Sequence, residues 1–440
     1  MKKSLVFVRS MFPDNPGHKL CGVSRPLFAS LAVLVLALTA SPPTAAQAPR
    51  PIGGESRVNT TDYAVEDDLD SLAVAIAEGG HFIVTWNEED GSYFFANSVI
   101  ARRYASDGTA LGDDFRVSDL DFYPSLEPDA AAAGDNFLVV WEDDEATPRQ
   151  IFARHLDAAG TLGDPFAVSA TAVPGQFDPA IDGGSDGFVV VWQQSYGAGD
   201  ILGQRIDTAG ARVGATFQVA SPTEIGEEEP DIAVADDGRF AVVWNDGADI
   251  EFQLFDSVGQ AQGATVELDV PSAGDLNARP SIAYGHDRYL VIWSVPDSSG
   301  VSDGDGNGLR YRFVDTGGSP IGVPVTLGVD TIGDQTRPDV TATNRGFQLT
   351  WTSPDGDGSG LKSRRFSTTG VFLGGVQTVN TSTTGTQRTS AVAAQGEGFI
   401  VAWVDDEVEQ VKARRYDEPL FGDGFESGTT VFWDLVVGGP

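Results

Sequence analysis

Two short segments of this chain, SDGDGNGL and PDGDGSGL, place oxygen-bearing side chains at alternate positions between glycines. Calcium in proteins takes about six to eight oxygen ligands, and alternate positions of a tight loop can converge on one ion. The spacing therefore predicts calcium binding, and the alternative is a pair of plain hairpin turns. The candidate ligands are Asp303, Asp305, Asn307, Asp355, Asp357 and Ser359.

Both segments resemble the opening D-x-D-x-[NS]-G of EF-hand loops and the calcium loops of integrin-type propeller repeats. Val314 and Phe366 stand at the twelfth position, where an EF-hand carries a glutamate. Tyr311 and Ser363 stand at the ninth position, where integrin-like loops carry an aspartate. At least one strong ligand is missing from each loop, so bound calcium would stabilise the fold rather than constitute a function.

Patterns that could support catalysis are unspecific. The histidines after residue 46 are His81, His155 and His286, and their contexts suggest neither a Ser-His-Asp arrangement nor a histidine metal site. Carboxylates are numerous enough to supply a glycosidase-like acid and base, but their number weakens that signal. The S-x-D-x-G-x-T-W box of sialidases is absent. We therefore assign no catalytic residue from the sequence.

A repeated unit must position these residues. Seven apolar runs each end in a tryptophan, and consecutive tryptophans stand 49 to 58 positions apart. Each copy divides into four short segments that are rich in Val, Phe and Ile, which is typical of β-strands. Four strands repeated seven times predict an all-β, seven-bladed β-propeller of four-stranded blades, with a β-solenoid as the alternative. The tryptophans are Trp86, Trp141, Trp192, Trp244, Trp293, Trp351 and Trp403.

The two ends of the repeat region complement each other. The segment ESRVNTTD, before the first full copy, looks like an isolated fourth strand, and the last copy departs from the pattern after its third strand. An N-terminal strand that completes the last blade would close the ring and remove exposed sheet edges. We therefore assign residues 55–417 to the propeller.

Residues that recur in every copy are interpreted as structural. We expect the seven tryptophans to pack between blades. We also expect the polar residue that recurs on the third strand to form structural hydrogen bonds. Those residues are Arg102, Arg154, Gln204, Gln253, Arg312, Arg364 and Arg414.

The loops after the tryptophans are often acidic, as in NEEDG, EDDEA and VDDEVE. If the first strand of each copy lies innermost, these loops share one rim with the long loops that lead into each blade, such as SPTEIGEEEP. Loops on a rigid scaffold commonly carry binding residues. We therefore expect an acidic rim that faces the ligand.

The first 46 residues have the pattern of a secretory signal peptide. Basic residues precede an apolar run at 27–40, which is too short to span a bilayer, and cleavage after Ala46 fits the small residues there. Cys21 and both methionines lie in this leader, so the processed chain would contain no disulfide. The sequence thus predicts a secreted or cell-surface protein with no membrane span, and a retained anchor is the alternative.

The charge balance excludes one class of partner. The chain has 64 acidic and 28 basic residues, a net charge of −36, and removal of the basic leader makes it more acidic still. Such a surface repels nucleic acid and attracts cations or basic partners. We therefore exclude nucleic-acid binding.

The C-terminal segment, residues 418–440, contains FGDGFESG followed by Trp433. It resembles a short tail that recurs on exported proteins of gram-negative bacteria, and the resemblance implies export or surface sorting. The repeats resemble those of uncharacterised secreted bacterial propellers, a family that supplies no catalytic residues to carry over.

These observations favour a secreted or surface-associated propeller that binds an extracellular glycan or protein without catalysis, with calcium as an expected stabiliser. The alternative is an extracellular glycan-active propeller enzyme, a hydrolase or a lyase.

Overall fold

The structure is a computed structural model that describes residues 49–60, 71–89, 97–119, 124–144, 149–170, 175–194, 199–220, 228–247, 249–269, 278–297, 302–328, 332–396 and 398–417. All of the described residues belong to one compact unit. The predicted leader, residues 1–46, and the predicted tail, residues 418–440, lie outside the described residues.

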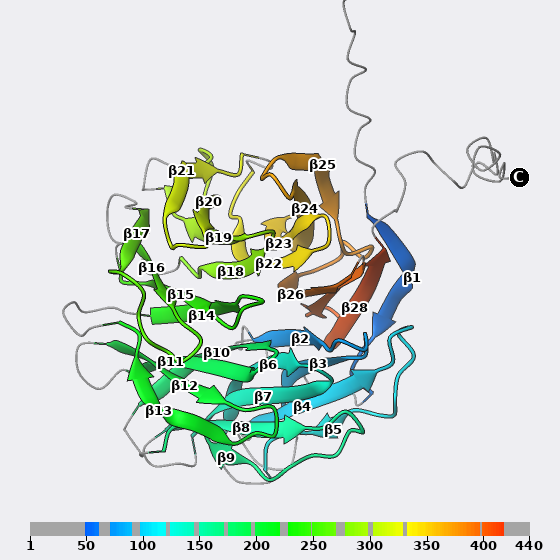
Figure 1. Ribbon diagram of the computed structural model, residues 1–440. Coiled ribbons are helices and arrows are strands. Elements are labelled where there is room, and N and C mark those ends of the chain that lie inside the picture. The colour runs from blue at the N-terminus through cyan, green and yellow to red at the C-terminus, as the bar shows by residue number, and fades with distance from the viewer. Residues whose placement is uncertain are drawn as a thin grey trace, which may run out of the picture. The chain divides into compact units, whose positions relative to one another are not determined.

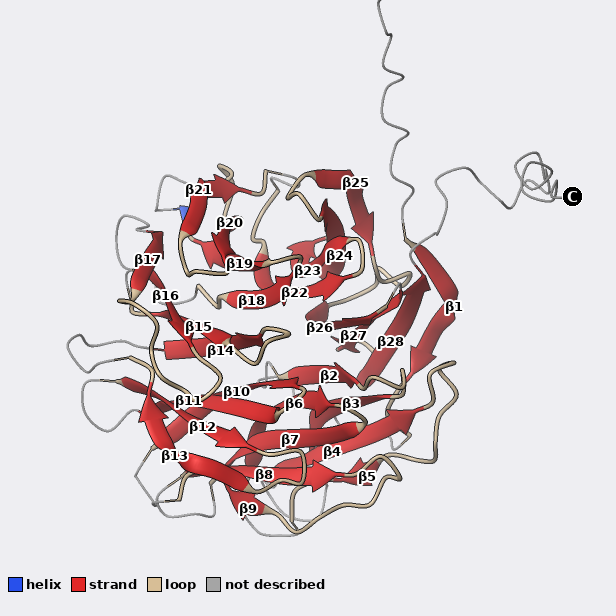
Figure 2. Cartoon of the chain, viewed as in Figure 1, coloured by secondary structure: helices blue, strands red, loops and turns tan. Residues whose placement is uncertain are grey.

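Seven antiparallel sheets of four strands each form a ring (Figures 1 and 2). Blade 1 contains β2 (Leu72–Ile76), β3 (Phe82–Glu89), β4 (Asn97–Tyr104) and β5 (Phe115–Arg116). Blade 2 contains β6 (Ser125–Ala133), β7 (Asn136–Asp143), β8 (Gln150–Leu156) and β9 (Phe166–Ala167). Blade 3 contains β10 (Gln176–Gly184), β11 (Gly187–Gln194), β12 (Asp200–Ile206) and β13 (Arg212–Gln218). Blade 4 contains β14 (Glu228–Val234), β15 (Phe240–Asn245), β16 (Ile250–Phe255) and β17 (Val266–Asp269).

The remaining three blades follow the same order. Blade 5 contains β18 (Ser281–Gly285), β19 (Arg288–Val295), β20 (Gly308–Asp315) and β21 (Pro320–Thr326). Blade 6 contains β22 (Thr336–Thr343), β23 (Gly346–Pro354), β24 (Ser359–Ser367) and β25 (Phe372–Thr378). Blade 7 contains β26 (Gln387–Gln395), β27 (Gly398–Asp405), β28 (Gln410–Asp417) and β1 (Arg50–Arg57). The predicted seven-bladed β-propeller is confirmed.

The ring closes as predicted, because β1 pairs antiparallel with β28 and becomes the outer strand of blade 7. Arg50 lies opposite Asp417, and Arg57 lies opposite Lys412. The closing strand begins at Arg50, earlier than the segment ESRVNTTD from which closure was predicted. Within the described ranges we find no helix long and apolar enough to cross a membrane.

The core lies between the blades. Trp141 packs with Val99 and Ala101 of blade 1, and Trp192 packs with Val140 and other residues of blade 2. The other five tryptophans likewise share an apolar cluster with the preceding blade. Because neighbouring blades cover both faces of the second strand, that strand is buried along its length, as in β11. The predicted packing of the tryptophans between blades is confirmed.

The recurring third-strand arginines are structural, as expected. The Nη1 of Arg154 in blade 2 donates to the carbonyl oxygen of Val117 in blade 1, at 2.8 Å. The Nη1 of Arg312 in blade 5 donates to the carbonyl oxygen of Leu268 in blade 4, at 2.7 Å. Each such bond joins a third strand to the end of the preceding blade, so these positions repeat for a reason of architecture.

Candidate active site

The first strand of every blade lines a central channel with a volume of about 610 Å³. This lies in the range of cavities that hold small ligands, about 300–1,000 Å³. Ala, Val and Ile form much of its wall. At Gly183 in β10 the backbone lies so close to β6 that only glycine fits, because an added Cβ would collide with the carbonyl group of Ala132. The innermost position of the first strands supports the strand order from which the rim was predicted.

Within two residues of the start of six inner strands, one residue lies in the left-handed backbone region, with φ from 36° to 53°. Five of the six precede a proline, a position that ordinarily favours extended backbone. The pairing with the second strand shifts register at this point in blades 2, 3, 4, 6 and 7, which forms a β-bulge. We call these residues the mouth ring; they line the channel and are Glu127, Asp178, Glu229, Arg279, Arg337 and Thr389.

A positive φ at a non-glycine residue costs on the order of 1–3 kcal/mol, and such strain persists only where surrounding contacts impose it. Six such residues at one end of one cavity therefore show that the surrounding contacts fix the backbone there. The backbone conformation recurs in six blades and belongs to the scaffold, whereas the residue at this position changes between acid, arginine and threonine. This difference between blades makes the mouth ring the candidate site.

Asp178, in blade 3, is held from blade 2. Its backbone N–H donates to Oε1 of Glu142 at 2.7 Å, and Oε2 of Glu142 accepts a bond from Nη1 of Arg149 at 2.9 Å. The guanidinium of Arg149 also lies over the ring of Phe177, 4.9 Å from its centre. The Glu142 side chain is 4% exposed, so it contacts Asp178 and Arg149 rather than a ligand.

The carboxyl groups of Glu142 and Asp178 both have raised pKa values. Burial raises the pKa of Glu142 to about 8, against the lowering effect of the bond from the Asp178 N–H. Burial also raises the pKa of Asp178, while the positive charges of Arg279 and Arg149 oppose the shift. Asp178 is therefore a partly buried carboxylate with two guanidinium groups close to it.

Glu229, in blade 4, has a cationic partner in blade 5. Its Oε2 accepts a bond from the backbone N–H of Arg279 at 3.0 Å, and its Oε1 lies 3.3 Å from Nε of Arg279. Burial raises the pKa of Glu229 to about 7, and the charge of Asp178 adds to the increase. Asp178 and Glu229 thus belong to one electrostatic cluster on adjacent blades.

This arrangement can perform acid–base chemistry. A carboxyl group with a pKa near 7 is able both to donate and to accept a proton at neutral pH. Two carboxyl groups in different environments are the minimal equipment for cleaving a glycosidic bond. The mouth ring therefore supplies a candidate acid–base pair, Asp178 and Glu229.

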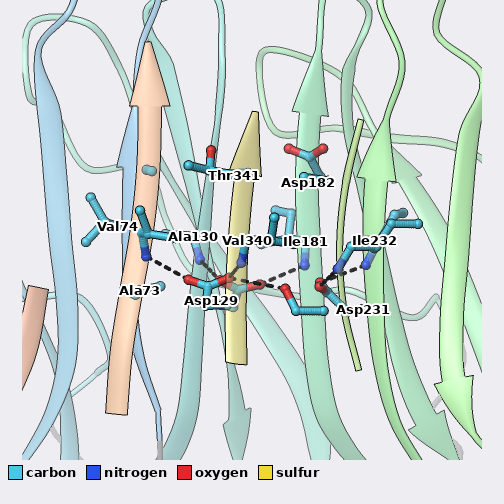
Figure 3. Close-up of a pocket in the computed structure, with 18 of the residues that line it drawn as sticks. Ala73, Val74, Asp129, Ala130, Ile181, Asp182, Asp231, Ile232, Val340 and Thr341 are labelled. Atoms are coloured by element: carbon cyan, nitrogen blue, oxygen red, sulfur yellow. Dashed lines mark hydrogen bonds between the residues drawn. The ribbon is translucent and has the colours of Figure 1, made fainter. Parts of the chain in front are cut away.

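Below the mouth ring, four further carboxylates face the channel, and we call them the wall aspartates. Oδ1 of Asp231 accepts a bond from the N–H of Ile232 in its own strand, and Oδ2 accepts one from Ile282 in blade 5, each at 2.8 Å. Figure 3 labels Asp129, Asp182 and Asp231, and its dashed lines mark hydrogen bonds at Asp129 and Asp231. The wall aspartates and the residues they join in the next blade are Asp129 with Ile181, Asp182 with Val234, Asp231 with Ile282, and Asp339 with Val392.

Burial in the channel wall also raises the pKa of each wall aspartate, although part of each side chain faces the channel. The pKa rises to about 8 for Asp129, about 7 for Asp182 and Asp339, and about 6 for Asp231. Backbone N–H groups oppose the shift in every case. Because their oxygens are occupied by backbone donors, these carboxylates join blades.

The structure places the first predicted calcium segment against the next blade. The N–H of Asn307 donates to Oδ1 of Asp334 at 2.8 Å, and the N–H of Gly333 donates to Oδ2 of Asp305 at 3.4 Å. A Cβ added at Gly306 would lie 2.8 Å from Asp334 Oδ1. One oxygen of Asp303, Oδ1, is buried without a hydrogen bond. The glycines are thus explained in part by close approach to blade 6.

The second segment lies against blade 7 in the same way. The hydroxyl of Ser359 donates to the carbonyl oxygen of Gln387 at 3.1 Å, and the N–H of Asp357 donates to Oδ1 of Asp355 at 3.3 Å. Oδ2 of Asp355 is buried without a hydrogen bond. In the described part of the chain, no group of three or more His, Cys, Asp or Glu side chains is arranged to hold a metal ion. Calcium at the two segments stays a prediction.

The three histidines join neighbouring blades. Nε2 of His155 in blade 2 lies 2.9 Å from the carbonyl oxygen of Thr208 in blade 3, and Nε2 of His286 in blade 5 lies 2.8 Å from that of Thr343 in blade 6. Nε2 of His81 lies 3.1 Å from the carbonyl oxygen of Asp135 in blade 2. They are separated around the ring, which agrees with the absence of a histidine site in the sequence.

Much of the predicted acidic rim falls on residues outside the described ranges, including 90–96, 145–148 and 221–227. Where the mouth is described, it is mixed in charge, because arginines accompany the carboxylates. The sequence analysis did not single out Asp178 or Glu229, although Glu229 lies in the segment SPTEIGEEEP that it assigned to the acidic rim. One signal was present: the residue before the recurrent proline is acidic in three copies and arginine in two, whereas the surrounding pattern repeats.

No protein-family model and no curated protein sequence matches this chain. Among solved structures, the ring is similar to an ulvan lyase, polysaccharide lyase PL25, with a TM-score of 0.53 and 11% identity, covering 84% of this chain and 96% of that one. It is also similar to the polysaccharide lyase Uly1, with a TM-score of 0.52 and 10% identity, covering 84% of this chain and all of that one (100%). At these identities the likeness shows the fold, a seven-bladed propeller that resembles glycan-active propellers.

These findings contradict the expectation of a non-catalytic binding propeller. Both similar structures are polysaccharide lyases, so the alternative, a glycan-active enzyme, is the better reading. The physical reason for the error is that the sequence analysis sought catalytic residues as recognisable local motifs. The mouth carboxylates come from single positions about one repeat apart, and only the ring brings them together.

Proposed function

We propose that this protein is an enzyme that cleaves glycosidic bonds of an extracellular glycan at the mouth of the central channel. The observation that carries the proposal is the pair of strained carboxylates, Asp178 and Glu229, on adjacent blades beside Arg279. The fold shared with polysaccharide lyases adds support. The predicted leader and tail support action outside the cell.

The two carboxyl groups would have different roles. Glu229, with a pKa of about 7, holds a proton over much of the neutral range and would donate it to the oxygen of the departing sugar. Asp178, beside Arg149 and Arg279, would act on the other side of the bond. In hydrolysis it would take a proton from an attacking water, or form a glycosyl ester that water then cleaves; in elimination it would remove the proton from the carbon next to a uronate carboxyl group. Glu142 would fix the backbone of Asp178 from behind.

The test is a screen of the purified protein against neutral, uronate-containing and sulfated polysaccharides, with new reducing ends as the readout. An unsaturated, ultraviolet-absorbing product would identify elimination, and its absence would identify hydrolysis. We expect Glu229→Gln to lose activity by about 10²–10⁴-fold, the usual contribution of a general acid. Glu127→Gln is the matched control, because Glu127 occupies the same left-handed position in blade 2, and it should lose far less. A screen in which no glycan is cleaved, or a fully active Glu229→Gln variant, would refute the proposal.

For the two segments at Asp303 and Asp355, we propose weak calcium binding that stabilises blades 5 and 6. One buried carboxylate oxygen without a hydrogen bond in each segment supports this assignment. The ligands would be those predicted from the sequence. Calcium would tie each loop to its blade and would take no part in bond cleavage.

A further inference from the structure

The mouth ring is divided by charge. Blades 2, 3 and 4 contribute Glu127, Asp178 and Glu229 at the left-handed position, whereas blades 5 and 6 contribute Arg279 and Arg337 at the same position. Because the blades stand in this order around the channel, the acids form one continuous arc and the arginines form the next. The same position of the blade therefore carries negative charge on one side of the channel and positive charge on the other.

The backbone holds the arginine arc in place. Arg279 and Arg337 both precede a proline and have φ values of 36° and 51°, so they share the left-handed backbone conformation of the acids at this position. The Arg279 side chain is 38% exposed while it contacts Glu229, so part of it is open to solvent at the channel mouth. Arg337 is half-buried and also lines the channel.

Guanidinium groups bind planar anions through paired, charge-assisted hydrogen bonds. A neutral sugar needs no such arc, and an anionic sugar next to Glu127 or Asp178 would meet like charge in a partly desolvated site. The anionic group of a bound chain would therefore lie over blades 5 and 6, with the bond to be cleaved beside Glu229. We infer that the substrate is an acidic glycan, whose carboxylate or sulfate group binds to Arg337 and Arg279.

This inference rests on the proposed function for the position of the bond, but the anion subsite is a binding property that can be measured without turnover. The net charge of −36 acts against it at long range, since it repels an acidic polymer before contact. Salt of about 0.1 M screens interactions beyond roughly 10 Å and leaves close ion pairs less affected. We therefore expect binding of an acidic oligosaccharide to strengthen as salt is first raised and to weaken only at higher concentrations.

The experiment uses the full chain carrying Asp178→Asn and Glu229→Gln, which keeps the mouth and removes its acid–base pair. Calorimetry compares a glucuronate-containing oligosaccharide, the same oligosaccharide with its carboxyl groups reduced to alcohols, and a sulfated neutral counterpart. We expect the anionic forms to bind at least tenfold more tightly than the reduced form. The preference for one anion over the other will distinguish a carboxylate subsite from a sulfate subsite.

Adding Arg337→Gln should remove the preference, with a loss of roughly tenfold, as expected when hydrogen bonds to a charged group are lost. Arg337→Lys should retain part of it, because the charge stays and the paired geometry is lost. Arg345→Gln is the control: it removes an arginine from the turn that follows β22, at the opposite end of the strand from Arg337, and the preference should persist. Equal affinity for the anionic and reduced forms, or a preference that survives Arg337→Gln in a protein with an unchanged melting temperature, would overturn the inference. If the anionic preference appears but the wild-type protein cleaves no glycan, the subsite stands and the proposed function fails.

Discussion

The mouth ring and the wall aspartates make an instructive comparison. Both lie on the same inner strands, a few residues apart, and both contain carboxyl groups whose pKa burial raises. The wall aspartates accept two backbone N–H bonds each, one of them from the next blade. Glu229 also accepts one backbone N–H bond from the next blade, but its other oxygen lies beside the guanidinium of Arg279. Asp178 is held through its backbone by Glu142. A raised pKa therefore does not identify a reactive group, whereas the partners of the carboxylate do.

After the loss expected for Glu229→Gln, the next largest effect concerns the residue that supports the mouth ring. Glu142→Gln keeps a side-chain oxygen for the N–H of Asp178 but removes the charge that binds Arg149. A small displacement of Asp178 should lower kcat by roughly tenfold to a hundredfold, because catalysis is sensitive to misplacement on the scale of an ångström. Steady-state kinetics across pH would measure it, since Arg149 also affects the pKa of Asp178. Unchanged kcat with an unchanged pH profile would show that Glu142 has no positioning role.

Substitution of a wall aspartate should lower stability and leave catalysis nearly unchanged. Asp129→Asn places an amide where a carboxylate accepts bonds from Ala130 and Ile181, so one backbone N–H loses its acceptor. We expect a loss of about 1–3 kcal/mol in the free energy of unfolding and little change in kcat per folded molecule. Chemical denaturation and active-site kinetics on the same sample would separate the two. A stable but inactive variant would show that Asp129 takes part in the reaction, and the distinction between wall aspartates and mouth ring would then be wrong.

The pH dependence of stability follows from the wall as well. The folded pKa values of the wall aspartates, about 6 to about 8, lie above the value of about 3.9 for an unfolded aspartate. The native state therefore binds more protons between about pH 4 and pH 8, and stability must fall as pH rises through that window. Melting temperatures at pH 5 and pH 8.5, at constant ionic strength, should decrease in that order. Asp129→Asn should reduce the slope, and a rise in melting temperature with pH would contradict this account.

The smallest effect is expected from calcium. At about tenfold saturation, one weak site adds about 1.4 kcal/mol to stability. The melting temperature in about 1 mM calcium should therefore be higher than that in excess chelator by a few degrees at most. Asp303→Ala combined with Asp355→Ala should abolish the difference. If the double variant responds to calcium like the parent, the two segments are turns and the ion binds elsewhere.

The ring could be predicted from the sequence because its signals are local and repeated. Seven tryptophans at similar spacing follow from seven interfaces of one kind, and the unpaired fourth strand at the start follows from closure. The interpretation of the recurring arginines was also correct, for the same reason. Repetition averages out the uncertainty of any single segment.

The mouth ring could not be predicted, because its character lies in differences between copies. Asp178, Glu229 and Arg279 are about 50 positions apart along the chain, and nothing local reveals that they adjoin. Their left-handed backbone opposes the usual behaviour of a residue before proline. The glycine-rich segments show the reverse case, a local pattern that has a purely structural explanation. A Cβ at Gly358 would lie 2.5 Å from the carbonyl oxygen of Gly385, so close packing against the segment that leads into blade 7 explains a glycine of the predicted calcium loop.

The closing strand also determines when the protein can finish folding. Ser56 on β1 bonds to Ala413 on β28, 357 positions later in the chain. Blades 1 to 6 consist of consecutive strands and can form as the chain emerges, but blade 7 must wait for its first-made and last-made segments to meet. Contacts of such long sequence separation slow folding. We expect the last kinetic phase of refolding to be the docking of residues 50–57, and a chain shortened to begin after Arg57 to fold into six blades with an incomplete seventh.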